Sequence, residues 1–379
     1  MKGISILAFS ILELEQKIQD LKKKSYQPTL GIVFASIKHD FVALQKVFRD
    51  HDIDILGASS SGEFVGGELA EKGIAVLFLD IKRTAYDIYF AETNYLNSYE
   101  RGRSIGQHSK KHFENTAFIT VFSLTVSAEE MIAGIHSEVG EKVPIFGGMA
   151  SDDFTMSATS VFTNSELSSG GVCTLILDND KIDIRGLALS GWEPLGLVNT
   201  ITKATDNIIY EINGKPALDE FIKFCGDYQD GNAIDDIASI SSAQYPLQIL
   251  REDTAVMRAL LYADKETKTM TMAGPVKEGD RFQFSIAPGF EILDETLDGF
   301  KKYKATLEHE ADAVVVFSCK ARHMSLGPMI EDEIEGLHEI WDKKPMIGFF
   351  SYGEVGQDDR KKAHYYNETC AIAIMKEKE

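Results

Sequence analysis

The chain has 379 residues, with 39 basic and 59 acidic side chains and a formal net charge of −20. This charge excludes nucleic acids and anionic membrane surfaces as partners, because both are bound through clustered Lys and Arg. Apolar residues make up 44% of the sequence, and no apolar run approaches the roughly 18 residues of a membrane span. We therefore expect a soluble protein of two domains.

The first residues and the cysteines predict a cytoplasmic location. Met1–Ser10 has one basic residue and a short apolar run, but Glu13 and Glu15 follow at once and no small-residue cleavage site appears. We expect a helical segment over residues 1–24 instead of a secretory signal. The four cysteines lack the spacing of metal or redox motifs, which fits a reducing compartment: Cys173, Cys225, Cys319 and Cys370.

One pattern occurs three times: an apolar strand, an amphipathic helix, a short strand that runs into a Gly-rich turn, and a closing apolar strand. The opening strands are expected at Leu30–Ser36, Ala117–Ser123 and Ala313–Ser318. The closing strands are expected at Gly73–Asp80, Gly171–Asp178 and Thr369–Met375. Nearly every position in these strands is apolar, which predicts an α/β protein of internally repeated units whose sheets are covered on both faces.

The helices between these strands have one apolar face. It carries Phe41, Leu44 and Phe48 in the first copy, Met131, Ile135 and Val139 in the second, and Ile330, Ile334, Leu337 and Trp341 in the third. Ser127 and Glu130 predict a capping box before the second of these helices. A further strand and helix are expected at 86–90 and 98–113, and again at 281–287 and 291–304.

A turn at Asn213–Pro216 and a following helix over 217–224 predict that a second domain begins near Asn213. We therefore expect an N-terminal domain over residues 25–212 and a C-terminal domain over residues 213–379. Residues 227–242 are acidic and Ser-rich, which predicts a surface loop. Strands are expected at 256–263 and 269–273.

A Gly/Ser/acidic turn leaves the middle strand of each copy. The three turns contain Gly57, Ser60, Gly62 and Glu63; Gly148, Ser151 and Asp152; and Gly348, Ser351, Gly353 and Glu354. Backbone N–H groups and Ser hydroxyls in such turns suit a small anion, and an adjacent acid suits an ammonium group. Open α/β sheets bind ligands outside the carboxyl ends of their strands, where we expect these turns. Alternatively, the turns serve only to cap nearby backbone groups.

The patterns typical of hydrolases and metal sites are weak in this sequence. Ser59–Gly62 lacks a glycine that a nucleophile elbow requires. His108 and His112 lie one helical turn apart, but the lysines between them indicate a solvated face. Cys319, Arg322 and His323 follow the third opening strand, and Arg322 is expected to bind an anion or to pair with Glu354. We expect a binding protein and not an enzyme.

The order of several short motifs resembles the FIST family, named for F-box and intracellular signal transduction. The motifs of its N-terminal domain are Gly57–Glu63, Phe146–Asp153, Gly191–Gly196 and Glu211–Leu218. The motifs of its C-terminal domain are Phe317–Arg322, Gly348–Glu354 and Asn367–Thr369. The resemblance covers most of the chain.

This resemblance implies a sensory protein that binds a small molecule, such as an amino acid or another small polar anion. It would act through a partner such as a histidine kinase or another transmitter protein. The expected ligand contacts are Ser60, Gly62, Glu63, Gly148, Ser151, Asp152, Cys319, Arg322, Ser351, Gly353, Glu354 and Asn367.

Some bacterial relatives look like haem-binding nitric oxide sensors, which is the alternative function; here His323 or His364 would be the axial ligand. Ser190 and Tyr366 stand where relatives tend to carry histidine, which argues against a direct transfer of haem ligation. We therefore expect no cofactor and no metal, with haem as the alternative. A protein-interaction scaffold is a third interpretation.

Overall fold

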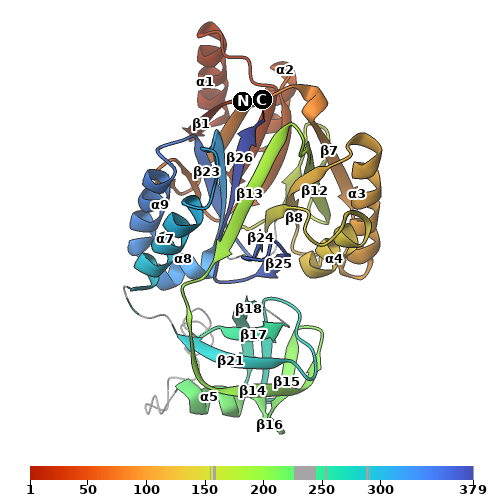
Figure 1. Ribbon diagram of the computed structural model, residues 1–379, viewed down its shortest axis with the longest axis vertical. Coiled ribbons are helices and arrows are strands. Elements are labelled where there is room, and N and C mark those ends of the chain that lie inside the picture. The colour runs from red at the N-terminus through yellow and green to blue at the C-terminus, as the bar shows by residue number, and fades with distance from the viewer. Residues whose placement is uncertain are drawn as a thin grey trace.

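The computed structural model describes residues 1–153, 155–156, 159–225, 245–251, 254–286, 289 and 291–378. A large α/β domain and a small β domain lie one beyond the other along the long axis of the molecule (Figure 1). The α/β class is thus confirmed. Within the described residues, no helix is both long enough and apolar enough to cross a membrane.

The described part of the large domain consists of three units in which elements follow the same order. The first unit contains β1 (Lys2–Ala8), α1 (Ile11–Lys23), β2 (Leu30–Ser36), α2 (Phe41–Asp50), β3 (Asp54–Ser60), β4 (Glu63–Val65), β5 (Glu68–Ala70) and β6 (Ile74–Asp80). The second contains β7 (Tyr86–Glu92), α3 (Ser98–His112), β8 (Thr116–Phe122), α4 (Ala128–Val139), β9 (Ile145–Met149), β10 (Val161–Phe162), β11 (Leu167–Ser168) and β12 (Gly171–Asp178), with the short 3-10 helices η1 (Arg83–Ala85) and η2 (Tyr95–Asn97). The third contains β13 (Ile182–Leu189), α7 (Glu291–Lys304), β22 (Ala313–Cys319), α8 (Lys320–Leu326), α9 (Met329–Ile340), β23 (Met346–Ser351), β24 (Glu354–Gln357), β25 (Ala363–Tyr366) and β26 (Cys370–Glu377).

The three units also share one strand order in their sheets. The orders are β1-β6-β2-β3, β7-β12-β8-β9 and β13-β26-β22-β23. In each sheet, the opening strand (β2, β8 or β22) is parallel to the middle strand (β3, β9 or β23). It is antiparallel to the closing strand (β6, β12 or β26). The repeat predicted from the sequence is therefore confirmed.

Each unit donates a hairpin to the sheet of another unit. β4-β5 pairs with β23, β10-β11 pairs with β3, and β24-β25 pairs with β9. A hairpin of each unit thus extends a sheet that it does not otherwise belong to. The three units are interlocked, so we expect none of them to fold as an independent domain.

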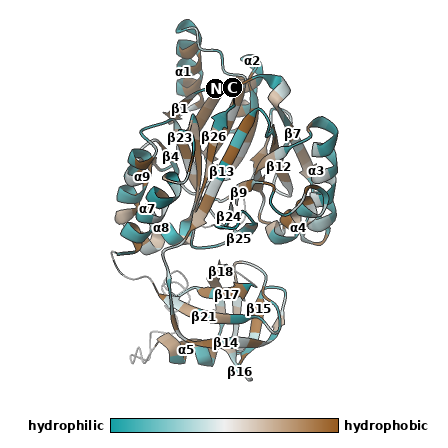
Figure 2. Cartoon of the chain, in the orientation of Figure 1, coloured by the Kyte–Doolittle hydropathy of each residue, from teal (hydrophilic) through white to brown (hydrophobic). Residues whose placement is uncertain are grey.

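The core explains why the repeated strands are apolar on both faces. Inner faces of the three sheets form one continuous cluster that includes Phe34, Ile119 and Phe317. Outer faces are covered by α1 and α2 in the first unit, α3 and α4 in the second, and α7 and α9 in the third. Figure 2 shows the corresponding pattern, with polar residues on the outer sides of the helices.

The small domain is inserted into the third unit between β13 and α7. It contains β14 (Glu193–Thr205), β15 (Ile208–Ile212), β16 (Lys215–Pro216), α5 (Ala217–Cys225), β17 (Leu247–Arg251), β18 (Thr254–Arg258), β19 (Leu260–Asp264), β20 (Thr269–Met272) and β21 (Arg281–Ile286). Its strands are ordered β18-β17-β21-β14-β15-β20-β19, with β16 beside β15. Its core cluster consists of its own residues together with Tyr366 of β25. The chain then returns to the large domain.

In the structure, the small domain spans the boundary that was expected at Asn213. Asn213 does not begin a domain; it lies with Gly214 in a hairpin turn, and both have positive φ (53° and 75°). An Asn-Gly pair is a strong signal for such a turn. The two strands that this turn joins, β15 and β16, both belong to the small domain. The predicted strand at 281–287 is β21 of that domain, so the strand that belongs with α7 in the repeat is β13.

The N-terminal helical segment is also only partly correct. Residues Lys2–Ala8 form β1, which pairs over its whole length with β6, and the helix begins only at Ile11. A strand whose partner lies 70 residues away is not visible in a local pattern. The expected loop at 227–242 lies outside the described residues.

Candidate functional site

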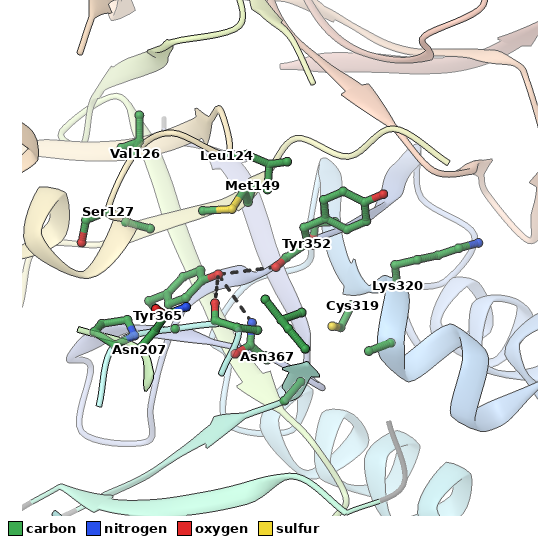
Figure 3. Close-up of a pocket in the computed structure, with 18 of the residues that line it drawn as sticks. Leu124, Val126, Ser127, Met149, Asn207, Cys319, Lys320, Tyr352, Tyr365 and Asn367 are labelled. Carbon is green, nitrogen blue, oxygen red and sulfur yellow. Dashed lines mark hydrogen bonds between the residues drawn. The ribbon is translucent and has the colours of Figure 1, made fainter. Parts of the chain in front are cut away.

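A cavity of about 340 Å³ lies between the large and the small domain, a volume typical of small-molecule sites. Its wall combines the ends of several strands of the large domain with loops of the small domain (Figure 3). The large domain contributes Tyr95, Leu124, Val126, Ser127, Ala128, Met149, Met156, Cys319, Lys320, Ala321, Ser351, Tyr352, Tyr365 and Asn367. The small domain contributes Asn207, Ala259, Leu261, Ala273, Gly274 and Pro275.

The position of the cavity follows from the topology. Leu124 follows β8, Met149 ends β9, Cys319 ends β22 and Ser351 ends β23. These are the carboxyl ends of two pairs of parallel strands, the place where open α/β sheets usually bind ligands. The small domain closes the other side.

Polar groups meet at one side of the cavity around the Tyr365 hydroxyl (Figure 3). This hydroxyl lies 3.2 Å from the Ala273 carbonyl and 3.4 Å from the Tyr352 carbonyl, and Asn367 Nδ2 is 3.5 Å away. Because its single proton goes to a carbonyl, the hydroxyl accepts from the Asn367 amide. Asn367 Oδ1 is buried and has no hydrogen-bond partner. A buried acceptor without a partner is rare and costly, and Asn367 lines the cavity, so this oxygen is a candidate contact for a ligand toward which the side chain turns.

Behind the cavity wall, Glu354 is fully buried and held by three donors. Its carboxylate accepts from Ser351 Oγ at 2.6 Å, from Thr369 Oγ1 at 3.0 Å and from the Thr369 amide at 3.4 Å. Burial raises the pKa of Glu354 to about 8. This side chain therefore links β24 to the start of β26. In its protonated form it donates to Ser351 Oγ, whose hydroxyl then donates to the Ser318 carbonyl at 3.3 Å.

The first unit contains the same arrangement. Ser60 donates to Glu63, and the Gly73 amide donates to the other Glu63 oxygen at 2.8 Å. Burial raises the pKa of Glu63 to about 7. Both oxygens are used and the residue is not part of the cavity wall, so this turn caps backbone groups, as the alternative interpretation had it.

The second turn is offset by one residue from the other two. Gly57, Gly147 and Gly348 are the equivalent positions, since each pairs with the second residue of the hairpin strand that is added to its sheet, which is Phe162, Val355 and Phe64, respectively. Ala150 therefore stands where the other units have Ser60 and Ser351. The repeat of Gly148, Ser151 and Asp152 proposed from the sequence was aligned on the wrong glycine, because adjacent glycines hide the register.

Ser151 and Asp152 form other contacts. Ser151 Oγ donates to the Phe350 carbonyl at 2.5 Å. Asp152 accepts from the Tyr352 hydroxyl and from the Met156 amide, both at 2.8 Å. Asp152 thus positions two residues of the cavity wall without lining it.

Arg322, which was expected to bind an anion or to pair with Glu354, is paired with Glu333 instead. Its guanidinium is fully buried, forms an ion pair with Glu333 of α9 with Nε at 3.1 Å from both oxygens, and donates to Thr296 Oγ1 at 2.9 Å. It also donates to the Ser190 carbonyl and lies over the Trp192 ring. Its charge is neutralised by a residue eleven positions later, which helix α9 brings back beside α8.

A buried arginine of the small domain joins the two domains next to the cavity. Arg258 donates to the Tyr365 carbonyl at 2.8 Å and to Glu129 of α4 at 2.6 Å. Its side chain is 1% exposed and its guanidinium lies over the Tyr365 ring. This contact fixes the domains at the polar side of the cavity.

Replacing Arg258 with methionine should therefore loosen the small domain. We expect a loss of about 1–3 kcal/mol in unfolding free energy, since charged hydrogen bonds are lost but Glu129 stays partly hydrated. Limited proteolysis should be faster between the domains. Lys301→Met, which removes an exposed pair with Asp298, should change either measurement little. Equal behaviour of the two variants would contradict this role of Arg258.

Comparison with known protein families agrees with the motif order. Residues 29–215 match the FIST N domain, and residues 190–357 match the FIST C domain. The chain belongs to the FIST family. The two matches overlap over 190–215, where the chain enters the small domain. FIST domains are associated with sensory functions in signal transduction.

Curated relatives of this FIST protein include proteins of Mycobacterium and Methanocaldococcus. Uncharacterized proteins of Mycobacterium bovis and Mycobacterium tuberculosis are each 22% identical over 240 residues, which is 61% of this chain and 60% of theirs. An uncharacterized protein of Methanocaldococcus jannaschii is 23% identical over 193 residues, 46% of this chain and 36% of its own. The FIST chain therefore spans less than two thirds of the length of these relatives.

The two histidines considered as haem ligands in this FIST protein do not face the cavity. His323 stacks on Phe350 with ring centroids 4.2 Å apart, and its Nδ1 lies 3.0 Å from Lys320 Nζ. His364 Nε2 lies 3.2 Å from Asp358 Oδ2. No histidine is among the described residues that line the cavity. The donor set expected for haem does not fit this cavity.

The sequence-predicted contacts thus separate into groups. Cys319, Ser351 and Asn367 line the cavity, and Glu354 and Gly353 lie directly behind it, with Gly353 packed against the Tyr365 ring. Ser60, Gly62 and Glu63 belong to the first unit, and Gly148 packs between Phe349 and Ser351. Tyr352 and Tyr365 were missed, although Tyr352 lies inside the Gly348–Glu354 motif. The residues of the small domain had no recognisable signal.

Proposed function

We propose that this FIST protein is a sensor that binds a small, mostly apolar molecule between its two domains and acts through a partner protein. The proposal is based on the cavity, whose wall is formed by residues of both domains. One of these residues is Asn367, whose Oδ1 has no hydrogen-bond partner. A ligand at this place contacts both domains at once. Its binding energy therefore favours one arrangement of the domains over others.

The wall indicates the chemistry of the ligand. Leu124, Val126, Met149 and Pro275 offer an apolar surface, and Asn367 Oδ1 requires an N–H or O–H donor. Lys320 is the charged residue among the described wall residues, but its amine extends away from Asn367 (Figure 3). A neutral molecule with an apolar body and one donor group fits best.

For an amino acid, the ligand class expected from the sequence, this cavity lacks the two charged partners that were expected. Arg322 was the expected partner of its carboxylate and is neutralised by Glu333. Glu354 was the expected partner of its ammonium group and is satisfied by Ser351 and Thr369 behind the wall. Amino acids therefore belong in the test as the competing ligand class.

Binding without chemistry is the activity that these groups support. Burial raises the pKa of the Cys319 thiol well above its usual value, so the thiol is neutral and a poor nucleophile. Among the described wall residues, no imidazole is placed to act as its base. The partner that reads the bound state would be a histidine kinase or another transmitter protein.

Indole and benzofuran form a matched pair of probes, since they have nearly the same shape and only indole has an N–H donor. We expect indole to bind more tightly by about 5- to 100-fold, because a buried unpaired acceptor costs about 1–3 kcal/mol. Isothermal titration calorimetry would measure both affinities. Asn367→Leu should abolish the difference between the probes.

Asn207→Ala provides the control, because Asn207 lines the same cavity but already donates to the Met272 carbonyl at 2.7 Å. This variant should keep the preference for indole. Equal affinities of the two probes in the unmodified protein would contradict the role of Asn367. Binding of neither probe, nor of any amino acid, would favour the scaffold interpretation.

A further inference from the structure

A second cluster of ligand-type side chains lies on the outer surface of the second unit, away from the cavity. Asp87 of β7 and His108 and His112 of α3 each offer one ligand atom, and these atoms all lie within 4.8 Å of one another. His108 Nε2 is 2.6 Å from Asp87 Oδ2, and the centroids of the two imidazole rings are 4.5 Å apart. These three groups therefore point at a common region.

Rigid elements hold the cluster in place. His108 and His112 lie one helical turn apart on α3, which packs against α4 through Gly102 and Gly106. Asp87 lies in β7, in register with Ile176 of β12, and Tyr89 on the same face contacts the His108 ring with centroids 4.9 Å apart. Sites built on helices and strands keep their geometry better than sites on loops.

The lysines between the histidines, which favoured a solvated face, do not block the cluster. Lys110 donates to Glu138 of α4 at 2.9 Å and so lies on the side of α3 that faces α4. Lys111 is exposed to solvent. The last turn of α3 ends at His112, and the carbonyl groups at such an end favour a nearby cation.

We propose that Asp87, His108 and His112 form a surface site for a divalent transition metal such as Zn²⁺. Two imidazoles and one carboxylate are a common donor set for this ion, and the half-exposed position leaves a fourth place for water. The bound metal joins the C-terminal end of α3 to β7. It would be a second input to the protein, separate from the cavity between the domains.

Titration calorimetry with Zn²⁺ tests the site in the full-length protein. We expect one equivalent to bind, and His112→Ala and Asp87→Asn to weaken this binding at least about tenfold. His112 is exposed, so its replacement leaves the fold intact. His309→Ala removes another exposed histidine outside the cluster and should leave Zn²⁺ affinity unchanged.

Cobalt gives a second measurement that does not depend on heat. Co²⁺ bound by this donor set should produce visible absorption bands that are absent in His112→Ala and present in His309→Ala. Absence of Zn²⁺ binding to the unmodified protein would overturn the proposal. Binding that persists at full strength in His112→Ala would overturn it as well.

Discussion

Replacing Arg322 with methionine is expected to destabilise the protein by about 3–5 kcal/mol, the usual cost of removing one partner of a buried ion pair. Arg322 and Glu333 are 0% and 1% exposed, so the remaining Glu333 carboxylate would have no water to replace the guanidinium. Thr296 and the Ser190 carbonyl would lose their donors too. Urea-induced unfolding would measure the loss.

The double variant Arg322→Met with Glu333→Leu separates a structural pair from a ligand contact. Removing both charges should restore much of the lost stability, since a buried pair replaced by apolar side chains is often neutral. Probe binding in the cavity should survive in the double variant. A stable Arg322→Met protein that has lost probe binding would instead show that Arg322 contacts the ligand.

The second large effect concerns pH and Glu354. Its pKa rises from 4.5 to about 8 on folding, so the folded state keeps a proton that the unfolded state has already released. The stabilisation is fully present below pH 4.5 and is lost as pH rises to about 8, at up to about 1.4 kcal/mol per pH unit. Stability should therefore fall between pH 7 and 8.

Glu354→Gln should flatten this part of the stability curve. The new side-chain amide does not titrate, and its N–H can donate to Ser351 Oγ as the protonated acid does. The Ser351 hydroxyl then donates to the Ser318 carbonyl, 3.3 Å away. Glu63→Gln is the matched control: the pKa of Glu63 is about 7, so this change acts mainly below that pH. His136 and His323, whose pKa burial lowers to about 4, give the opposite slope only below about pH 6.5. Burial and the neighbouring Glu354 raise the pKa of Glu368 well above its usual value, so Glu368 contributes to the same slope and should keep part of it in Glu354→Gln. A Glu354→Gln protein whose slope between pH 7 and 8 is as steep as that of the unmodified protein would contradict the protonated state of Glu354.

The sequence predicted the features that local pattern encodes. Leu30–Ser36 is apolar at nearly every residue, and it forms a strand with a helix layer on one side and the shared core on the other. The helix that follows Ser127 begins there because the Ser127 hydroxyl accepts from the Glu130 amide at 3.4 Å. Such signals lie within a few residues of the structure that they determine.

Features that depend on distant residues were not predictable in this way. The exchange of β4-β5, β10-β11 and β24-β25 between sheets leaves no local pattern, because short strands pair with whichever edge the fold presents. The pairing of Arg322 with Glu333 required knowing how α9 packs against α8. Asn367 was named from its motif alone, and only the cavity shows which of its atoms lacks a partner.

The three units differ at positions around the proposed ligand cavity. The first unit has Ser36 and Gly73 where the third has Cys319 and Thr369, as strand pairing places them. The third unit alone also receives the inserted domain, which supplies the opposite wall of the cavity. The hydrogen bonds of Ser60 with Glu63 and of Ser351 with Glu354 occur in the first and the third unit alike. We therefore assign them to the shared scaffold and not to ligand specificity.

The position of indole in a crystal structure of the complex would show where the ligand binds. We expect indole between the small domain and the carboxyl ends of β22 and β23, with its N–H directed at Asn367 Oδ1. Indole bound only on exposed apolar residues such as Leu197 of β14, with the cavity lacking it, would contradict the account.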